Sequence, residues 1–380
     1  MRVVYYLPSL YIAGGLERVI TRKANYLADQ LGYEVTILTS EQQGRETYYP
    51  LSPNVRHHDL GVVIDNPKHK SLLLKILTYP VKYVQFKKLF SAFLTDAKPD
   101  ITISTLRRES NFIHTIRDGS IKIGELHITR NSYSILSNKI RKFSKPIHKY
   151  LNRRFVNKLK HFEKIILLTK EEQKLWPELN NTVVIHNYQV MECEIPSTLK
   201  HKRVIAVGRY TYQKGFDLLV EAWRLVAFKH PDWSLHVYGE GDRTELEQRI
   251  KELDLTKSFM ANGKTDSIIE KYLESSIFVL SSRYEGFGMV LTEAMSCGVP
   301  PVSFACPSGP RDIITHGVDG LLVENGNIDK LAENICTLIE NEDLRKVMGG
   351  NARESVKRFR KEVIMAEWKQ LFEELMSSRS

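Results

Sequence analysis

Short apolar runs alternate with longer segments of helical periodicity along most of the chain. Residues 3–7 and 34–39 have the apolar, β-branched character of buried strands, and between them apolar side chains recur every three or four positions. The same rhythm returns with strand candidates at residues 101–104, 121–125 and 164–168. This alternation predicts a parallel sheet covered by helices, because parallel strands need a long crossover that is usually helical.

The rhythm starts again after residue 200. Strand candidates lie at residues 203–207, 234–238, 277–280 and 299–303, with helical patterns between and after them. The preceding stretch, residues 187–201, lacks periodicity and contains Pro196. We therefore predict an α/β protein with two Rossmann-like, doubly wound domains, residues 1–187 and 188–360, followed by an amphipathic helix in residues 361–380.

The distribution of charge predicts an anionic partner for the first domain. The chain of 380 residues is 42% apolar and 26% charged, ordinary values for a globular protein. Residues 1–190 contain 30 basic and 16 acidic side chains, a net charge of +14, whereas residues 191–380 contain 25 and 29, a net charge of −4. A membrane surface, an anionic lipid, a polyanionic glycan or a nucleic acid would suit the basic half.

Basic and apolar residues are mixed in two tracts of this half, residues 68–93 and 139–164. The second tract contains ten Lys and Arg residues among aromatic and aliphatic ones. Helices of this composition can lie in a membrane interface with their bases reaching the headgroups, or can bury the apolar residues in the core and expose a basic face. No recognised nucleic-acid-binding module accompanies them.

Several common chemical signatures are missing from the sequence. The four cysteines (Cys193, Cys297, Cys306 and Cys336) form no CxxC pair, so we expect free thiols. There is no P-loop, HExxH, GxSxG or Asp-x-Asp motif, and the twelve histidines lack metal-ligand spacing. The sequence therefore predicts neither a catalytic metal nor a cofactor. No signal peptide or membrane span is expected either, which favours the cytosol.

Glycines follow two of the predicted strands. Gly14 and Gly15 open the first helix, where they either leave room for a ligand or permit a tight turn. Gly239 and Gly241 resemble a dinucleotide fingerprint without its third glycine, for which a structural turn is the favoured interpretation.

Charged residues at strand ends of the second domain are the strongest candidates for chemistry. Arg209 and Lys214 occupy the loop between its first strand and first helix, and two cations beside a helix N-terminus can clamp a pyrophosphate. Glu285 and Glu293 follow the strand at residues 277–280, in the run Glu-Gly-Phe-Gly-Met-Val-Leu-Thr-Glu. Carboxylates at such positions accept hydrogen bonds from sugar hydroxyls.

These residues resemble the signature of a known enzyme family. The spacing of Glu285 and Glu293 is similar to the E-x7-E signature of glycosyltransferase family 4, whose members have the GT-B fold, two Rossmann-like domains that face a central cleft. Residues 208–215 resemble its diphosphate-binding loop, and residues 14–15 resemble its N-terminal glycine loop. The resemblance is most specific between residues 203 and 325.

The resemblance implies a retaining, metal-independent transfer of a hexose or N-acetylhexosamine from a nucleotide-diphosphate sugar. Arg209 and Lys214 would neutralise the leaving diphosphate, Glu293 would hold the ribose, and Glu285 would hold the donor sugar. His127 resembles the family's histidine facing the donor sugar, the alternative being an ordinary core or surface histidine. The remaining donor-binding positions would be Gly14, Gly15, Gly208, Phe287, Gly288 and Met289.

The frequency of UDP in the family favours a UDP-sugar donor, and the implied acceptor is a hydroxyl of a lipid-linked or cell-envelope glycan. We expect the enzyme in the cytoplasm, peripheral on the inner face of the membrane, without a nucleic acid partner, and with its C-terminal helix packed back on the N-terminal domain. Two alternatives stay open. One is a nucleotide-sugar binding protein without turnover, and the other is a nicotinamide-dependent oxidoreductase, against which the missing third glycine argues.

Overall fold

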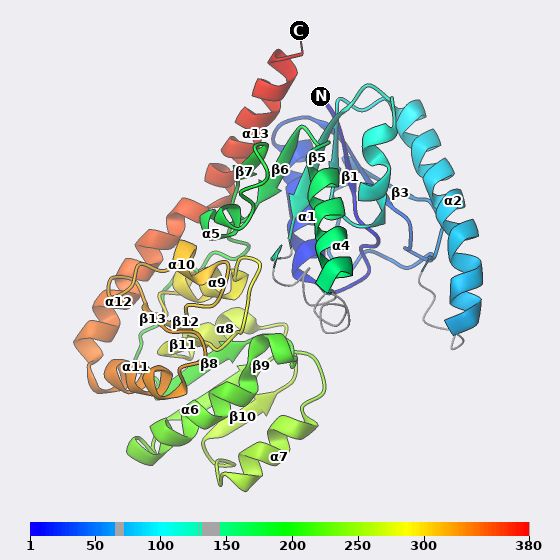
Figure 1. Cartoon of the computed structure of the whole chain (residues 1–380). Helices are drawn as coiled ribbons and strands as arrows, with labels where there is room; N and C mark the ends of the chain where they lie inside the picture. Colours follow the sequence, from blue (N-terminus) through cyan, green and yellow to red (C-terminus); the bar gives the residue numbers. More distant parts are fainter. Residues whose placement is uncertain (65–71, 128, 131–144, 380) are drawn as a thin grey trace.

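The protein consists of two parallel β-sheets, each covered by helices (Figure 1). The computed structural model describes all residues except 65–71, 128, 131–144 and 380. Both sheets are doubly wound, because the chain extends the sheet on one side of a central strand and later returns to that strand's other side. The predicted α/β architecture with two Rossmann-like domains is confirmed.

The N-terminal domain contains the first sheet. Its strands are β1 (Arg2–Tyr6), β2 (Glu34–Thr39), β3 (Val55–Asp59), β4 (Ile101–Ser104), β5 (Ile121–Leu126), β6 (Lys164–Leu167) and β7 (Thr182–Val184). They follow the order β3-β2-β1-β4-β5-β6-β7. The helices are α1 (Gly15–Asp29), α2 (Leu72–Ala97), α4 (Lys145–Leu159) and α5 (Lys170–Lys174), with the short 3₁₀ helices η1 (Arg108–Asn111) and η2 (Ile113–Thr115).

The C-terminal domain contains the second sheet. Its strands are β8 (Arg203–Val207), β9 (Ser234–Tyr238), β10 (Phe259–Asn262), β11 (Ile277–Leu280), β12 (Pro301–Phe304) and β13 (Leu321–Val323), in the order β10-β9-β8-β11-β12-β13. Its helices are η3 (Tyr212–Lys214), α6 (Phe216–Lys229), α7 (Thr244–Glu252), α8 (Ile268–Leu273), α9 (Met289–Ser296), α10 (Pro310–Ile313), α11 (Ile328–Glu340), α12 (Glu342–Ser355) and η4 (Val356–Phe359).

Four inner strands of the two sheets are buried on both faces. Every residue of β4, β5, β11 and β12 is buried. A parallel sheet between helical layers favours apolar side chains on both faces, as in β11 (Ile-Phe-Val-Leu), whereas β5 also buries the charged residues Lys122 and Glu125.

The last helix, α13 (Lys361–Ser377), runs along the N-terminal domain (Figure 1). Trp368 and Phe372 belong to the same buried core as Tyr5 of β1, and the ring of Phe372 lies 6.4 Å from that of Tyr33. The chain therefore crosses between the domains twice, once after β7 and once between η4 and α13. The two crossings touch, because the N–H of Gln189 donates to the carbonyl of Phe359 (2.6 Å).

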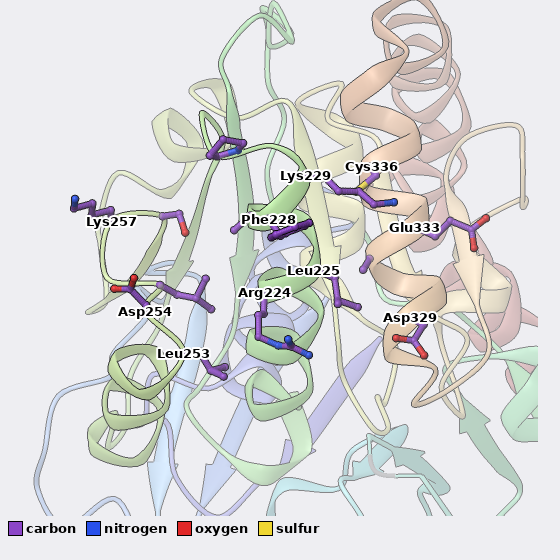
Figure 2. A pocket seen from close by; sticks show the side chains of 15 residues that line it. Arg224, Leu225, Phe228, Lys229, Leu253, Asp254, Lys257, Asp329, Glu333 and Cys336 are labelled. Carbon is purple, nitrogen blue, oxygen red and sulfur yellow. The ribbon is translucent and has the colours of Figure 1, made fainter.

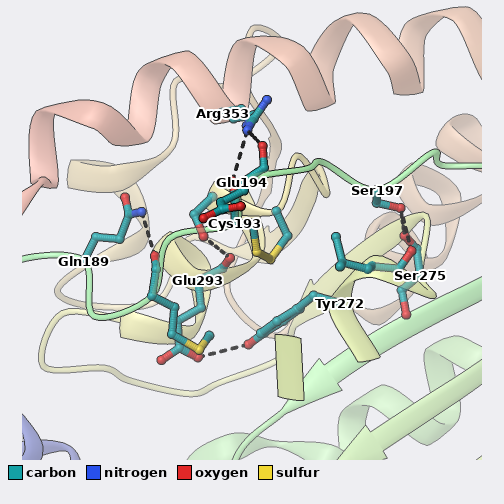
Figure 3. The surroundings of a disulfide bond; sticks show 12 residues. Gln189, Cys193, Glu194, Ser197, Tyr272, Ser275, Glu293 and Arg353 are labelled. Carbon is teal, nitrogen blue, oxygen red and sulfur yellow. Dashed lines mark hydrogen bonds between the residues drawn. A yellow bond between two sulfur atoms is a disulfide. The ribbon is translucent and has the colours of Figure 1, made fainter. Parts of the chain in front are cut away.

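The expectation of free thiols is wrong for two of the four cysteines. Cys193, in the first crossing, and Cys297, directly after α9, form a disulfide with a Cα–Cα distance of 5.1 Å (Figure 3). The crossing folds back along α9, where the N–H of Ser197 donates to the carbonyl of Cys297 (2.8 Å). The cysteines are 104 residues apart, so their spacing gives no sign of the pairing. Cys306 and Cys336 are buried free thiols, as expected.

Among the described residues, no helix combines the length and the apolar character needed to cross a membrane.

Candidate active site

The two sheets bring their ligand-binding edges together. The strand order reverses between β1 and β4 in the first sheet and between β8 and β11 in the second. Doubly wound proteins bind ligands at such points, because the loops after the two strands diverge and leave a crevice. Here the loops meet across the domains. A Cβ added to Gly286 would lie 2.7 Å from the carbonyl oxygen of His127, and one added to Gly15 would lie 3.9 Å from the Met289 sulfur.

A cavity of about 280 Å³ lies between these loops. Five of the residues predicted from the sequence line it: Gly15, Gly208, Arg209, Met289 and Glu293. The N-terminal domain also contributes Arg18 and Tyr49, and the ends of β9 and β10 contribute Tyr238, Gly239, Glu240 and Lys264. The other predicted residues do not line the cavity. They are Gly14, His127, Lys214, Glu285, Phe287 and Gly288.

Glu293 is held by both domains. It lies on α9 with its side chain 5% exposed; its Oε1 accepts a hydrogen bond from Arg18 of α1 (2.9 Å), and its Oε2 accepts one from the Tyr272 hydroxyl (3.2 Å; Figure 3). Burial raises the pKa of Glu293, and the Arg18 charge acts against that rise. Each carboxylate oxygen can accept a further bond, so the side chain retains capacity for two hydroxyls of a ligand.

Lys214 and Glu285 form the second ion pair of the site. Lys214 Nζ lies 2.7 Å from Glu285 Oε1, which also accepts a hydrogen bond from the Ser282 hydroxyl (2.5 Å). The backbone N–H of Glu285 donates to the carbonyl of Pro307 (3.1 Å), which fixes the turn. The stem of Lys214 packs on Gly208, where a Cβ would lie 3.0 Å from it. The loops after β8 and β11 thus place a cation and a carboxylate beside the cavity.

Arg209 is exposed and lines the cavity. Its charge is felt across the cleft by Glu17 of α1. Burial raises the pKa of the Glu17 carboxyl, while the charges of Arg107, His127 and Arg209 act to lower it. The Glu17 carboxylate is therefore within electrostatic range of basic side chains from both domains.

The predicted glycines have different structural roles. Gly288 precedes α9 with φ = 96°, a left-handed conformation that a residue with a side chain rarely adopts. Gly14 precedes α1, and a Cβ there would lie 1.9 Å from Glu17 Oε2, so only a residue without a side chain leaves room for that carboxylate. The side chain of Phe287 is buried 5.5 Å from the ring of Phe359, in the core rather than the cavity.

Gly239 is explained by packing between loops. A Cβ at this position would lie 1.8 Å from the carbonyl oxygen of Gly208. The turn after β9 therefore needs glycine to approach the diphosphate-loop candidate after β8, which favours the structural interpretation over a dinucleotide fingerprint.

His127 follows β5, and its side chain is 10% exposed. Its Nε2 lies 3.0 Å from Oε1 of Glu125, which is fully buried and also accepts from Lys23 of α1. Sequence reasoning identified His127 but neither Glu125 nor Lys23.

A larger cavity, of about 770 Å³, lies between α6 and α11, away from the cleft between the domains (Figure 2). Phe228, which is 89% exposed, lines it with Lys229, Glu333 and Cys336. Among the described residues, one group has the spacing of metal ligands: His230, Cys336 and Glu340, whose ligand atoms lie within 4.8 Å of one another. None of the predicted site residues belongs to it.

Comparison with solved structures identifies the fold. The structure matches that of a TarM mutant from S. aureus in complex with fondaparinux, alpha-GlcNAc-glycerol and UDP, with a TM-score of 0.76 and 18% sequence identity over 98% of this chain and 99% of that one. The chain has the GT-B fold, as the resemblance of its motifs implied.

Comparison of sequences finds a family match in the second half of the chain. Residues 193–355 match the family model of glycosyl transferases group 1. The chain is 27% identical to an uncharacterised glycosyltransferase of Haemophilus influenzae, over 97% of this chain and 99% of that one. It is also 27% identical to the amylovoran biosynthesis glycosyltransferase AmsD of Erwinia amylovora, over 94% and 95%. The matched segment contains Arg209, Lys214, Glu285 and Glu293.

Proposed function

We propose that the protein is a retaining glycosyltransferase of family 4 that transfers a hexose or N-acetylhexosamine from a UDP-sugar to a hydroxyl of a lipid-linked or cell-envelope glycan. The observation that carries the proposal is the cavity between the two switch points, with Arg209 and Glu293 in its wall and the Lys214–Glu285 pair beside it. The TarM complex supports the choice of nucleotide, since it contains UDP.

The leaving diphosphate is the centre of the proposed chemistry. Breaking the bond to the sugar places negative charge on the β-phosphate, and Arg209 and Lys214 offer fixed positive charge where it develops. The N-terminus of α9, next to Gly288, adds backbone N–H groups of the kind that bind phosphate. With these groups present, the reaction needs no metal ion to neutralise the leaving group.

The two carboxylates are proposed to accept hydrogen bonds from the ribose and the hexose of the donor. Glu293 would accept hydrogen bonds from the ribose hydroxyls through the capacity that Arg18 and Tyr272 leave free. Glu285 would accept from the donor hexose, oriented by Ser282 and Lys214. His127 would face the same sugar from the opposite domain, with backbone groups of Phe287, Gly288 and Met289 completing the pocket.

A panel of UDP-sugars tests this function directly. The purified protein is incubated with each donor, with and without membrane glycolipid extract, and UDP release is measured; NMR of the product then gives the anomeric configuration. We expect UDP release with at least one donor and a product that retains the donor's α configuration. Tight donor binding without release or transfer would instead favour the binding-protein alternative, and an inverted product would contradict the retaining mechanism.

A second proposal concerns where the reaction occurs: we propose that the N-terminal domain docks on an anionic membrane. Helix α2 buries Phe86 and Phe90 on one face and exposes Leu77, Val81 and Val84 (64%, 71% and 65%) on the opposite one. Helix α4 likewise exposes Ile147 and Tyr150 (53% and 62%) beside basic residues. Residues 68–71 and 139–144 of the two predicted tracts lie outside the described residues.

The positive charge of this surface favours an anionic membrane as its partner. Exposed cations accompany the apolar side chains: Lys88 on α2, and Lys149, Arg153 and Arg154 on α4. The segment η1–η2 connects the helices, because Lys87 lies 5.9 Å from the Phe112 ring and Lys158 donates to Asn111. Apolar groups framed by cations fit an anionic leaflet, to which each basic side chain contributes ~1 kcal/mol.

Vesicle co-sedimentation tests the docking surface. We expect binding to phosphatidylglycerol vesicles that falls with salt, and a loss of about a thousandfold at low salt when Lys88, Lys149, Arg153 and Arg154 are all changed to Ser. Val81→Ser/Val84→Ser should weaken binding, whereas the control Phe228→Ser/Val347→Ser, which changes two other exposed apolar residues on the C-terminal domain, should not. Equal binding by all these variants, or none by the wild type, would refute the proposal.

A further inference from the structure

A buried ion pair lies beside His127 at the carboxyl end of β5. Glu125 is fully buried, Lys23 of α1 is 2% exposed, and Lys23 Nζ donates to Glu125 Oε1. The same oxygen lies 3.0 Å from His127 Nε2. One carboxylate oxygen thus faces both the ammonium and the imidazole.

The carboxylate in this group stays ionised. Burial alone raises the pKa of the Glu125 carboxyl, but the charge of Lys23, the neighbouring His127 and the hydrogen bond from Lys23 lower it to about 2. An unpaired carboxylate would be strongly disfavoured at a site with this degree of burial. Glu125 is therefore an obligate acceptor at neutral pH, and Lys23 is the cation that makes it so.

The C-terminal helix packs against Lys23. Lys23 Nζ lies 4.0 Å from the centroid of the Trp368 ring on α13 and 5.9 Å from that of Tyr5 on β1. The faces of aromatic rings attract a desolvated cation. Trp368 therefore helps to hold the ammonium at Glu125, and the arrangement depends on α13 crossing back onto this domain.

His127 connects the pair to the cleft. Its carbonyl oxygen packs against Gly286, the residue after Glu285. Its Nε2 and Glu125 Oε2 are both buried without an aligned hydrogen-bond partner among the described residues. The two atoms thus lie 3.0 Å apart without hydrogen-bond alignment, and a small rotation of the ring would turn the approach into a hydrogen bond.

We propose that Lys23 and Glu125 are positioning residues that set the orientation and tautomer of His127. The carboxylate stabilises the imidazole with a proton on Nε2, which leaves Nδ1 as the ring's acceptor. The proposal rests on the proposed function, because it concerns the histidine assigned to the donor sugar.

A paired substitution separates this role from a contribution to folding. Glu125→Gln alone leaves the Lys23 ammonium buried without a counter-charge, which is strongly destabilising whatever the role of the pair in the reaction. The double variant Lys23→Met/Glu125→Gln removes both charges and keeps both shapes. Its matched control is Lys122→Met/Asp118→Asn, which removes a pair of similar length (2.5 Å) and burial (8% and 0% exposed) involving the other end of β5.

Steady-state kinetics on the active UDP-sugar give the first readout. For the Lys23→Met/Glu125→Gln variant we expect kcat to fall about tenfold to a hundredfold, the usual effect of losing such a supporting partner. KM and the affinity for UDP, which lacks the sugar, should stay near wild type. The control variant should match the wild type in all three. Wild-type kcat in the folded Lys23→Met/Glu125→Gln variant would overturn the proposal.

Histidine NMR gives a readout that does not need turnover. Two-bond ¹H–¹⁵N spectra of histidine-labelled protein distinguish the tautomers, and His127→Asn assigns the His127 signals. We expect the Nε2-protonated pattern in the wild type and in the control, and its loss in Lys23→Met/Glu125→Gln. If no UDP-sugar is turned over, the proposed function fails while this comparison still decides the inference. Identical His127 patterns in all three proteins would overturn it.

Discussion

Replacing Lys214 by methionine tests whether this side chain neutralises the negative charge of the leaving diphosphate. The substitution keeps the stem that packs on Gly208 and removes the ammonium, 2.7 Å from Glu285 Oε1. The side chains of Lys214 and Glu285 are only 14% and 7% exposed, so water does not solvate the Glu285 carboxylate in place of the lost ammonium. Ser282 remains as a donor to the carboxylate.

Two separate losses are expected from this change. The rate should fall by about 10²–10³, the effect of removing one preorganised donor from a developing negative charge. The free energy of unfolding should fall by about 3 kcal/mol, the lower end of the range for breaking a buried ion pair, because Ser282 still donates to Glu285. Lys214→Met/Glu285→Gln should recover the stability and not the rate.

Arg209→Ala is the matched comparison for these measurements. Arg209 is exposed, so its loss should change the free energy of unfolding by no more than about 0.5 kcal/mol while lowering the rate by a factor similar to that for Lys214. UDP release with the active donor and urea unfolding are measured on each variant. Near wild-type rates in folded Lys214→Met and Arg209→Ala would refute the assignment of the diphosphate loop.

Four further outcomes are expected. Activity should survive exhaustive chelation, and a complete loss reversed by magnesium or manganese would contradict the proposed neutralisation of the leaving group by side chains. Thiol titration of the unfolded, unreduced chain should find two thiols, and four only after reduction; four before reduction would contradict the Cys193–Cys297 disulfide. A double-mutant cycle of Arg18→Gln and Glu293→Gln on urea unfolding should give a coupling of about 1.5–3 kcal/mol, and purely additive effects would mean that the pair does not hold the domains in solution. The pKa of Glu125 is lowered from 4.5 to about 2, so its ionised form stabilises the fold fully above pH 4.5 and loses this effect as the pH falls toward 2. Urea unfolding at several acid pH values should therefore show a larger loss of stability in the wild type than in Lys23→Met/Glu125→Gln.

The strands that the sequence predicts and those that it misses differ in one physical respect. The nine predicted strands are the inner ones of the two sheets, where a neighbouring strand on each side and helices on the faces favour apolar residues. The missed ones, β3, β7, β10 and β13, are the four edges. In β3, Val-Arg-His-His-Asp, only Val55 is buried, because an edge strand pairs on one side and needs no apolar run.

The site divides in the same way between local and distant information. Arg209, Lys214, Glu285 and Glu293 could be predicted because each belongs to a short motif at a strand end. Arg18 could not, since its partner Glu293 is 275 residues away. One signal was present: a cation in the first turn of a helix opposes the helix dipole, so Arg18 needed a nearby anion.

Lys23 and Glu125 carry no such signal. Each sits at a position that the periodicity assigns to the core, and their burial as an ion pair depends on where α13 lies. The sequence could not predict that arrangement from the spacing of these residues, because three elements from both ends of the chain build it.

The contact between the two crossings has a consequence for motion. The Gln189–Phe359 hydrogen bond joins the crossings side by side, and the disulfide at Cys193 ties the rest of the first one to the C-terminal domain. The domains therefore have a single hinge, a few residues long, instead of two independent tethers. We expect the sheets to separate by rotation about this hinge, which would break the Arg18–Glu293 pair and also the Glu171–Arg311 pair between α5 and α10.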